Sequence, residues 1–243
     1  MVNMLAMDRL TLILDADDTL WENNVFYEEA IAAFAECMAG EGFDREEARQ
    51  TFNCIEHERV LLVGYAPEEF VRSMVIAYRA LCQQHGCQPR LAVEREVETL
   101  GRRVIEYPIV LLDGVGESIP RLHRYCRLLL LTKGDRQAQQ SKVDRSGLAA
   151  YFEAVHIVPE KDVQVLHSLL QRHRLDPQRT WMVGNSPRSD INPALAAGIG
   201  AVYIPYAVPW DFEEAPITDP ARVVTLQCFA GLLDLFPAPE GHV

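Results

Sequence analysis

The stretch Leu10–Trp21 reads Leu-Thr-Leu-Ile-Leu-Asp-Ala-Asp-Asp-Thr-Leu-Trp, an apolar run that ends abruptly in three carboxylates. An apolar run without alternation is typical of a strand that is buried on both faces of a sheet. Asp15, Asp17 and Asp18 then fall at the carboxyl end of that strand, where open α/β sheets bind ligands. Like charges gathered there need compensation, which a divalent cation with oxygen ligands can supply. An acidic turn without a ligand explains this stretch alone equally well.

The composition excludes several classes of protein. Of the 243 residues, 49% are hydrophobic and 24% are charged, which is ordinary for a globular protein. The formal net charge of −12 argues against nucleic-acid binding, because a phosphate backbone requires a basic surface. The sequence shows neither a membrane-length apolar stretch nor a signal-peptide pattern, and its six cysteines form no Cys-x-x-Cys pair. We therefore expect a cytoplasmic protein with free thiols and no membrane contact.

Residues 21–109 carry helical signals only. Capping residues, glycines and prolines predict four helices, at about 24–40, 45–63, 67–85 and 89–107. A helical run without a strand predicts a small domain inserted into a larger one. We therefore expect a core domain made of residues 1–20 and 110–243, and a helical domain made of residues 21–109 that is inserted into it.

After residue 109 the expected strands and helices alternate. The strands are predicted at 127–132, 154–158, 180–184 and 201–204, and the helices at 115–125, 137–145, 161–173, 190–197 and 226–236. Alternation of this kind predicts a parallel sheet with right-handed crossovers. The strand that precedes the inserted domain supplies the remaining member of this α/β sheet.

Polar residues suited to one site follow the later strands. Thr132 ends one strand, and Lys133 and Gly134 follow it near the start of a helix, where they could cradle an anion. Lys161 is predicted at the start of another helix, against the usual preference of the helix dipole, as suits a residue that meets an anion. The chain has two other lysines, Lys133 and Lys142, so each lysine is informative.

The fourth strand runs into Gly-Asn-Ser-Pro-Arg-Ser-Asp, where Asn185 and Asp190 offer oxygen ligands for a hard cation. These features, in this order, resemble the motifs of the haloacid dehalogenase (HAD) superfamily. The four motifs are Asp15–Thr19, Thr132, Lys161 and Asn185–Asp190. The resemblance covers nearly the whole chain and implies a Rossmann-like, three-layer parallel sheet core with an inserted all-helical cap domain of the C1 type.

The resemblance also implies a role for each motif residue. Asp15 would be the nucleophile that becomes an aspartyl phosphate, and Asp17 would be the general acid and base. Thr132 would bind the phosphoryl oxygens, and Lys161 would neutralise the nucleophile and the phosphate. Lys142 is the competing candidate for this lysine, but it lies before the third strand, whereas the family pattern places the lysine after it.

Magnesium is the cofactor that the resemblance implies. Its ligands would be Asp15, the main-chain carbonyl of Asp17, and the fourth motif with Asn185 and Asp190. The family motif usually begins Gly-Asp, and the neutral Asn185 in this chain places more weight on Asp190. Among the residues predicted to bind substrate are Thr132, Lys133, Gly134 and Trp21, although Trp21 is equally well explained by packing.

Two features of the sequence help to decide between the branches of this family: the presence of Asp17 and the absence of lysine from residues 21–109. A dehalogenase of this family lacks the second acid that Asp17 supplies, and a phosphonatase needs a cap lysine, which residues 21–109 lack. A phosphosugar mutase keeps both aspartates and stays open, as does a catalytically weak binding or regulatory protein, which Asn185 alone favours. The resemblance favours a magnesium-dependent phosphatase that hydrolyses a small phosphorylated metabolite and acts as a monomer or homodimer.

Overall fold

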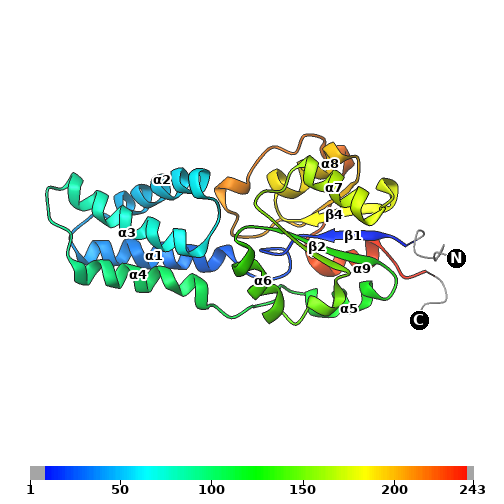
Figure 1. Ribbon diagram of the computed structural model, residues 1–243, viewed down its shortest axis with the longest axis horizontal. Coiled ribbons are helices and arrows are strands. Elements are labelled where there is room, and N and C mark those ends of the chain that lie inside the picture. Colours follow the sequence, from blue (N-terminus) through cyan, green and yellow to red (C-terminus); the bar gives the residue numbers. More distant parts are fainter. Residues whose placement is uncertain (1–8, 240–243) are drawn as a thin grey trace. The chain divides into compact units, whose positions relative to one another are not determined.

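A computed structural model describes residues 9–239 of the chain (Figure 1). It divides into two compact units. Residues 9–24 and 109–239 form the first unit, and Val25–Pro108 form the second. The first unit is an α/β domain and the second is helical, as the sequence predicts.

The helical unit contains four helices. They are α1 (Asn24–Gly40), α2 (Arg45–Val63), α3 (Pro67–Gln84) and α4 (Leu91–Glu106), close to the predicted ranges. Asp44 accepts a hydrogen bond from the Glu47 N–H and so begins α2, and Gly64 ends it with a φ of 80°. The apolar faces of the helices share one core, in which the rings of Phe52 and Phe70 meet edge to face 5.2 Å apart.

The α/β unit is built on one parallel sheet of six strands in the order β3-β2-β1-β4-β5-β6. The strands are β1 (Thr11–Leu14), β2 (Arg127–Lys133), β3 (Ala154–Val158), β4 (Thr180–Gly184), β5 (Gly200–Tyr203) and β6 (Val223–Thr225). The chain leaves β1 toward β2 and β3 and later returns to its other side with β4. The strand order therefore reverses at β1, and such a switch point is where open α/β sheets bind ligands.

Helices cover both faces of the sheet (Figure 1). They are α5 (Val115–His123), α6 (Arg136–Arg145), α7 (Val163–His173), α8 (Asn192–Ala197) and α9 (Leu232–Leu235). Alternate residues of β1 serve the two faces: Leu12 and Leu14 share a core with α5, α6 and α9, whereas Ile13 packs with α7 and α8. All three side chains are fully buried, which explains the apolar run without alternation.

The C-terminal region departs from the prediction. The helix expected at 226–236 is shortened to α9, with a 3-10 turn at Phe229–Gly231 before it, and the strand β6 was not expected. Phe229 and Leu232 are both buried in the core, so an irregular segment places the apolar residues as well as a longer helix would. Val223 and Val224 pair with β5 and extend the sheet by one strand.

The state of the cysteines and the length of the apolar helices were also predicted from the sequence. All six cysteines, which lie within residues 9–239, are free thiols. None of the helices in that range is long and apolar enough to cross a membrane. The cytoplasmic location stays a prediction.

Candidate active site

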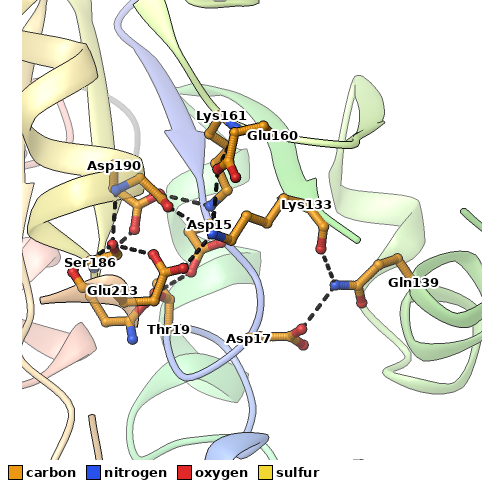
Figure 2. A network of polar contacts seen from close by, with 12 residues as sticks. Asp15, Asp17, Thr19, Lys133, Gln139, Glu160, Lys161, Ser186, Asp190 and Glu213 are labelled. Atoms are coloured by element: carbon orange, nitrogen blue, oxygen red, sulfur yellow. Dashed lines mark hydrogen bonds and ion pairs between the residues drawn. The ribbon is translucent and has the colours of Figure 1, made fainter. Parts of the chain in front are cut away.

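Asp15 lies directly after β1, and its N–H continues the sheet by donating to the Val183 carbonyl at 2.9 Å. The Lys161 ammonium donates to Asp15 Oδ1 and, at 2.7 Å, to Asp190 Oδ1 (Figure 2). Asp15 and Lys161 are each 5% exposed and Asp190 is fully buried. Burial alone would lower the pKa of the Lys161 ammonium, but Asp15 and Asp190 outweigh it and raise that pKa. Lys161 is therefore held charged between two carboxylates.

Asp190 is aimed at Lys161 by a tight turn. Its Oδ2 accepts a hydrogen bond from the Ser186 N–H at 3.0 Å, and a Cβ at position 184 would lie 2.2 Å from that oxygen, so Gly184 is required. Burial raises the pKa of Asp190 to about 7, although Lys161 acts in the opposite direction. Since both carboxylate oxygens have partners, these contacts show Asp190 holding Lys161, and its role as a metal ligand stays a prediction.

A hydroxyl joins the nucleophile candidate to the fourth motif. Thr19 Oγ1 lies 2.8 Å from Asp15 Oδ2 and 3.2 Å from Asn185 Oδ1. A carboxylate and an amide oxygen that converge in this way are ligands that Mg²⁺ accepts. In residues 9–239 no three His, Cys, Asp or Glu side chains are grouped to hold a metal. The donor set thus fits magnesium with one well-placed carboxylate and otherwise neutral oxygens.

Asp17 faces away from Asp15, toward α6 (Figure 2). Its carboxylate accepts hydrogen bonds from Trp21 Nε1 at 2.7 Å, Gln139 Nε2 at 2.9 Å and Lys142 Nζ at 2.8 and 2.9 Å. Burial would raise the pKa of Asp17, but Lys142, with Gln139 and Trp21, lowers it overall. Spacing alone could not reveal the contacts of Gln139 and Lys142, although the scarcity of lysine drew attention to Lys142.

Trp21, for which the sequence allows either a substrate contact or a packing role, has the surroundings of a packing residue, and its contact with substrate stays a prediction. The side chain is fully buried and packs in the core of the α/β unit, and its indole N–H is used by Asp17. The Gly134 N–H donates to the Val158 carbonyl at 3.0 Å, so this group already has an acceptor, and the anion-binding role of the turn stays a prediction. Lys161 also lies before α7 rather than in it, since Asp162 is the capping residue. The helix begins two residues later than the sequence predicts, and Lys161 lies just outside its N-terminal end.

Lys133, at the end of β2, belongs to a second ion-pair group in the α/β unit. Its ammonium donates to Ser189 Oγ at 3.0 Å, to Glu160 at 3.4 Å and to Glu213. Lys133 and Ser186, with Ser189, lower the pKa of Glu213 against the effect of burial, which would raise it. Glu213 was missed by sequence reasoning because it lies in a connecting segment without a recognisable motif. Thr132 is buried beside Lys133 at the end of the same strand.

Asp18 shapes the turn rather than the reacting centre. It has a φ of 61°, in the left-handed region that Asp tolerates better than most residues. Its carboxylate accepts hydrogen bonds from the Asn23 N–H at 2.8 Å and the Asn24 N–H at 3.0 Å. Asp18 therefore holds the start of α1 and lies 8% exposed. Burial, with Asp17 and Asp15, raises its pKa to about 7 against these hydrogen bonds.

Replacement of Asp18 by Asn should stabilise the metal-free fold at pH 8. A carboxyl whose pKa rises from about 4 unfolded to about 7 folded weakens stability as the pH rises through that window. Asn keeps an acceptor and tolerates the backbone angle, so we expect a gain of up to about 4 kcal/mol at pH 8 that shrinks toward pH 4. Urea unfolding of both proteins at pH 4.5 and pH 8 with chelator measures it, and an unchanged difference between the two pH values would contradict the assignment.

Comparison with known proteins assigns the chain to a family. The family model for haloacid dehalogenase-like hydrolases matches residues 10–198. An N-acylneuraminate-9-phosphatase from Mus musculus is 34% identical over 98 residues, which are 38% of this chain and 40% of that protein. A phosphoserine phosphatase from Thermus thermophilus is 32% identical over 145 residues, or 57% of each chain. The chain thus matches less than two thirds of the length of these relatives.

A solved structure extends the comparison to nearly the whole chain. The haloacid dehalogenase-like family hydrolase from Xanthomonas campestris superposes with a TM-score of 0.79 at 27% identity, over 93% of this chain and 90% of that one. The residues that the family model matches include the four motifs, from Asp15 to Asp190, and the fold brings Asp15, Lys161 and Asp190 into contact. The chain belongs to the haloacid dehalogenase-like hydrolase family.

Proposed function

We propose that this chain is a magnesium-dependent phosphatase that hydrolyses a small phosphorylated metabolite through an aspartyl phosphate. The observation that carries the proposal is the different surroundings of two neighbouring carboxylates. Asp15 lies against Lys161 and the Thr19 hydroxyl, as suits a nucleophile, and Asp17 is held apart from it by α6. Two carboxylates in distinct environments are typical of sites that divide nucleophilic and acid–base work.

In the proposed reaction a carboxylate oxygen of Asp15 attacks the phosphorus atom and the bond to the ester oxygen breaks. Asp17 exchanges one of its hydrogen-bond donors for a proton and gives that proton to the departing oxygen, then takes a proton from the water that attacks the aspartyl phosphate. Phosphate leaves and Asp15 is regenerated. Lys161 stays protonated throughout and offsets the negative charge that gathers at Asp15.

Asp15, the main-chain carbonyl of Asp17 and Asn185 would hold the magnesium ion, and Asp190 would contribute if it exchanged Lys161 for the metal. Bound magnesium would supply neutralisation of the phosphoryl oxygens and alignment of the ester. Because Asn185 is neutral, we expect magnesium to bind more weakly than in a site with two carboxylates.

Replacement of Asn185 by Asp tests this donor set. The variant should reach half-maximal activity at about a tenth of the magnesium concentration, because a second carboxylate would strengthen the site. Without metal the new charge beside Asp15 should lower the melting temperature, and magnesium should raise it more than in the parent. The same change at Asn192, which bonds the main chain at Thr218, is the matched control. Unaltered magnesium dependence of both activity and melting temperature would place the ion elsewhere.

The relatives support the substrate class. Their names describe phosphatases, one for N-acylneuraminate 9-phosphate and one for phosphoserine. We infer that Val25–Pro108 acts as the cap that selects a small ester, and that Thr132 contributes to binding of the phosphoryl group. A phosphosugar mutase of the same family is the alternative, since it would need the same two aspartates.

The deciding experiment is a screen of small phosphate esters, sugar phosphates and a 2-haloacid, with magnesium and with chelator. Phosphate release that requires magnesium supports the proposal, and the best ester identifies the substrate class. Transfer of phosphate within a sugar phosphate instead of to water would favour the mutase, and halide release would favour a dehalogenase. Folded protein that turns over nothing would favour a binding or regulatory role.

A further inference from the structure

Lys142 has a well-defined place in the α/β unit that the proposed reaction has so far not used. Its ammonium carries three hydrogens, and three oxygens accept them: Asp17 Oδ1 at 2.9 Å, Asp17 Oδ2 at 2.8 Å and Asn23 Oδ1 at 2.7 Å. The side chain is 17% exposed. All hydrogen-bonding capacity of this lysine is thus directed at Asp17 and at the residue that precedes α1.

The hydrogen-bond acceptor positions of the Asp17 carboxylate are likewise all used. Two carboxylate oxygens offer about four acceptor positions. Oδ1 receives Trp21 and Lys142, and Oδ2 receives Gln139 and Lys142. The orientation of this carboxylate is therefore set by its donors from two directions, the buried indole on one side and α6 on the other.

The helix α6 presents these donors as a unit. Gln139 and Lys142 are three residues apart and so lie on one face of the helix. Gln139 Nε2 also donates to the Lys133 carbonyl at 2.6 Å, which ties that face to the end of β2. Asp135 begins the helix by accepting from the Ala138 N–H at 2.8 Å. The position of Lys142 is thus fixed by the same strand end that carries Thr132.

We propose that Lys142 is the positioning residue of the general acid and base, and that it holds the Asp17 carboxylate toward the leaving-group side and away from Lys161. This inference rests on the proposed function. The site then divides its lysines, with Lys161 on Asp15 and Lys142 on Asp17. Lys142 itself transfers no proton. Without it, Asp17 would keep only the neutral donors Trp21 and Gln139, which would leave its carboxylate less firmly oriented.

Leaving-group dependence tests the proposal. An alkyl phosphate needs a proton on its departing oxygen, whereas p-nitrophenolate departs without one, so loss of a well-placed acid affects the two esters unequally. We expect Lys142→Met to lower kcat/KM about 30- to 100-fold for an alkyl phosphate and less than about 5-fold for p-nitrophenyl phosphate. Lys142→Arg should recover part of the alkyl activity. Arg145→Met removes a charge from the same helix and should change neither ester.

A double-mutant cycle separates positioning from general support of the fold. In an Asp17→Asn background, Lys142→Met should cause no further loss on the alkyl ester, because the group that it positions is already gone. Equal losses on both esters, or losses that add in the double variant, would overturn the proposal. If the Lys142→Met variant does not fold, Lys142→Gln can be compared on the same two esters and in the same double-mutant cycle. Failure of the proposed function itself would look different: the parent would release no phosphate from either ester, or would keep its activity when Asp15 is replaced.

Discussion

Asp15→Asn is expected to abolish phosphate release, by at least about 10³-fold in kcat, while the protein stays folded. The amide keeps the shape of the side chain but is a poor nucleophile, so no aspartyl phosphate can form. Lys161 keeps Asp190 as a partner, and the Thr19 hydroxyl keeps Asn185. The loss should therefore appear in turnover and not in the melting temperature.

Two measurements make this result specific. Rapid acid quench of the parent during turnover should trap phosphate on the protein, and the Asp15→Asn variant should trap none. The matched control is Asp162→Asn, next to Lys161, because Asn also caps α7 and leaves the site unchanged. Activity in Asp15→Asn that equals the parent would exclude Asp15 as the nucleophile and would point to another site or to a contaminating enzyme.

The strands that carry the site were predictable because their signals are local. Ala154–Val158 and Thr180–Gly184 have the predicted bounds, since each is a short apolar run between turn residues. The end of β1 was equally plain from an apolar run that stops at Asp15. The strand β6 was not predictable in the same way, because three residues form a strand only when the edge of β5 is available to pair with them.

The partners of the charged residues depended on the fold. Lys142 and Asp17 are separated by 125 residues, and no spacing within α6 indicates which carboxylate that helix will meet. The fourth motif shows the same limit. The sequence identifies Asn185 and Asp190 as oxygen donors, but only the turn at Gly184 shows that Asp190 points at Lys161. The sequence therefore identifies residues that are suited to the chemistry, whereas only the structure shows which of them form pairs.

The second large effect is expected at Lys161, whose side chain is 3% exposed. Lys161→Met would leave Asp15 and Asp190 buried together without the cation between them. Breaking a buried ion pair from one side typically costs about 3–5 kcal/mol, because a desolvated charge is left uncompensated. We expect a loss of stability of that size at pH 8, together with loss of activity.

The pH dependence of this loss identifies its cause. Burial already raises the pKa of Asp190 to about 7, and removal of Lys161 takes away the main opposing influence, so that pKa should rise further. A carboxyl with a folded pKa above its unfolded value binds protons preferentially in the folded state, which stabilises the fold as the pH falls. The deficit of Lys161→Met relative to the parent should therefore be largest at pH 8 and shrink toward pH 5.

Urea unfolding of the parent, Lys161→Met and Lys161→Met/Asp190→Asn at pH 8 and pH 5.5 measures both effects. The second substitution removes one of the stranded charges, so it should recover about half of the lost stability at pH 8 and little at pH 5.5. A deficit that did not change with pH would indicate lost packing of the lysine side chain rather than uncompensated charge. Recovery by Asp190→Asn at pH 8 would instead establish that the uncompensated Asp190 carboxylate is a main cause of the lost stability.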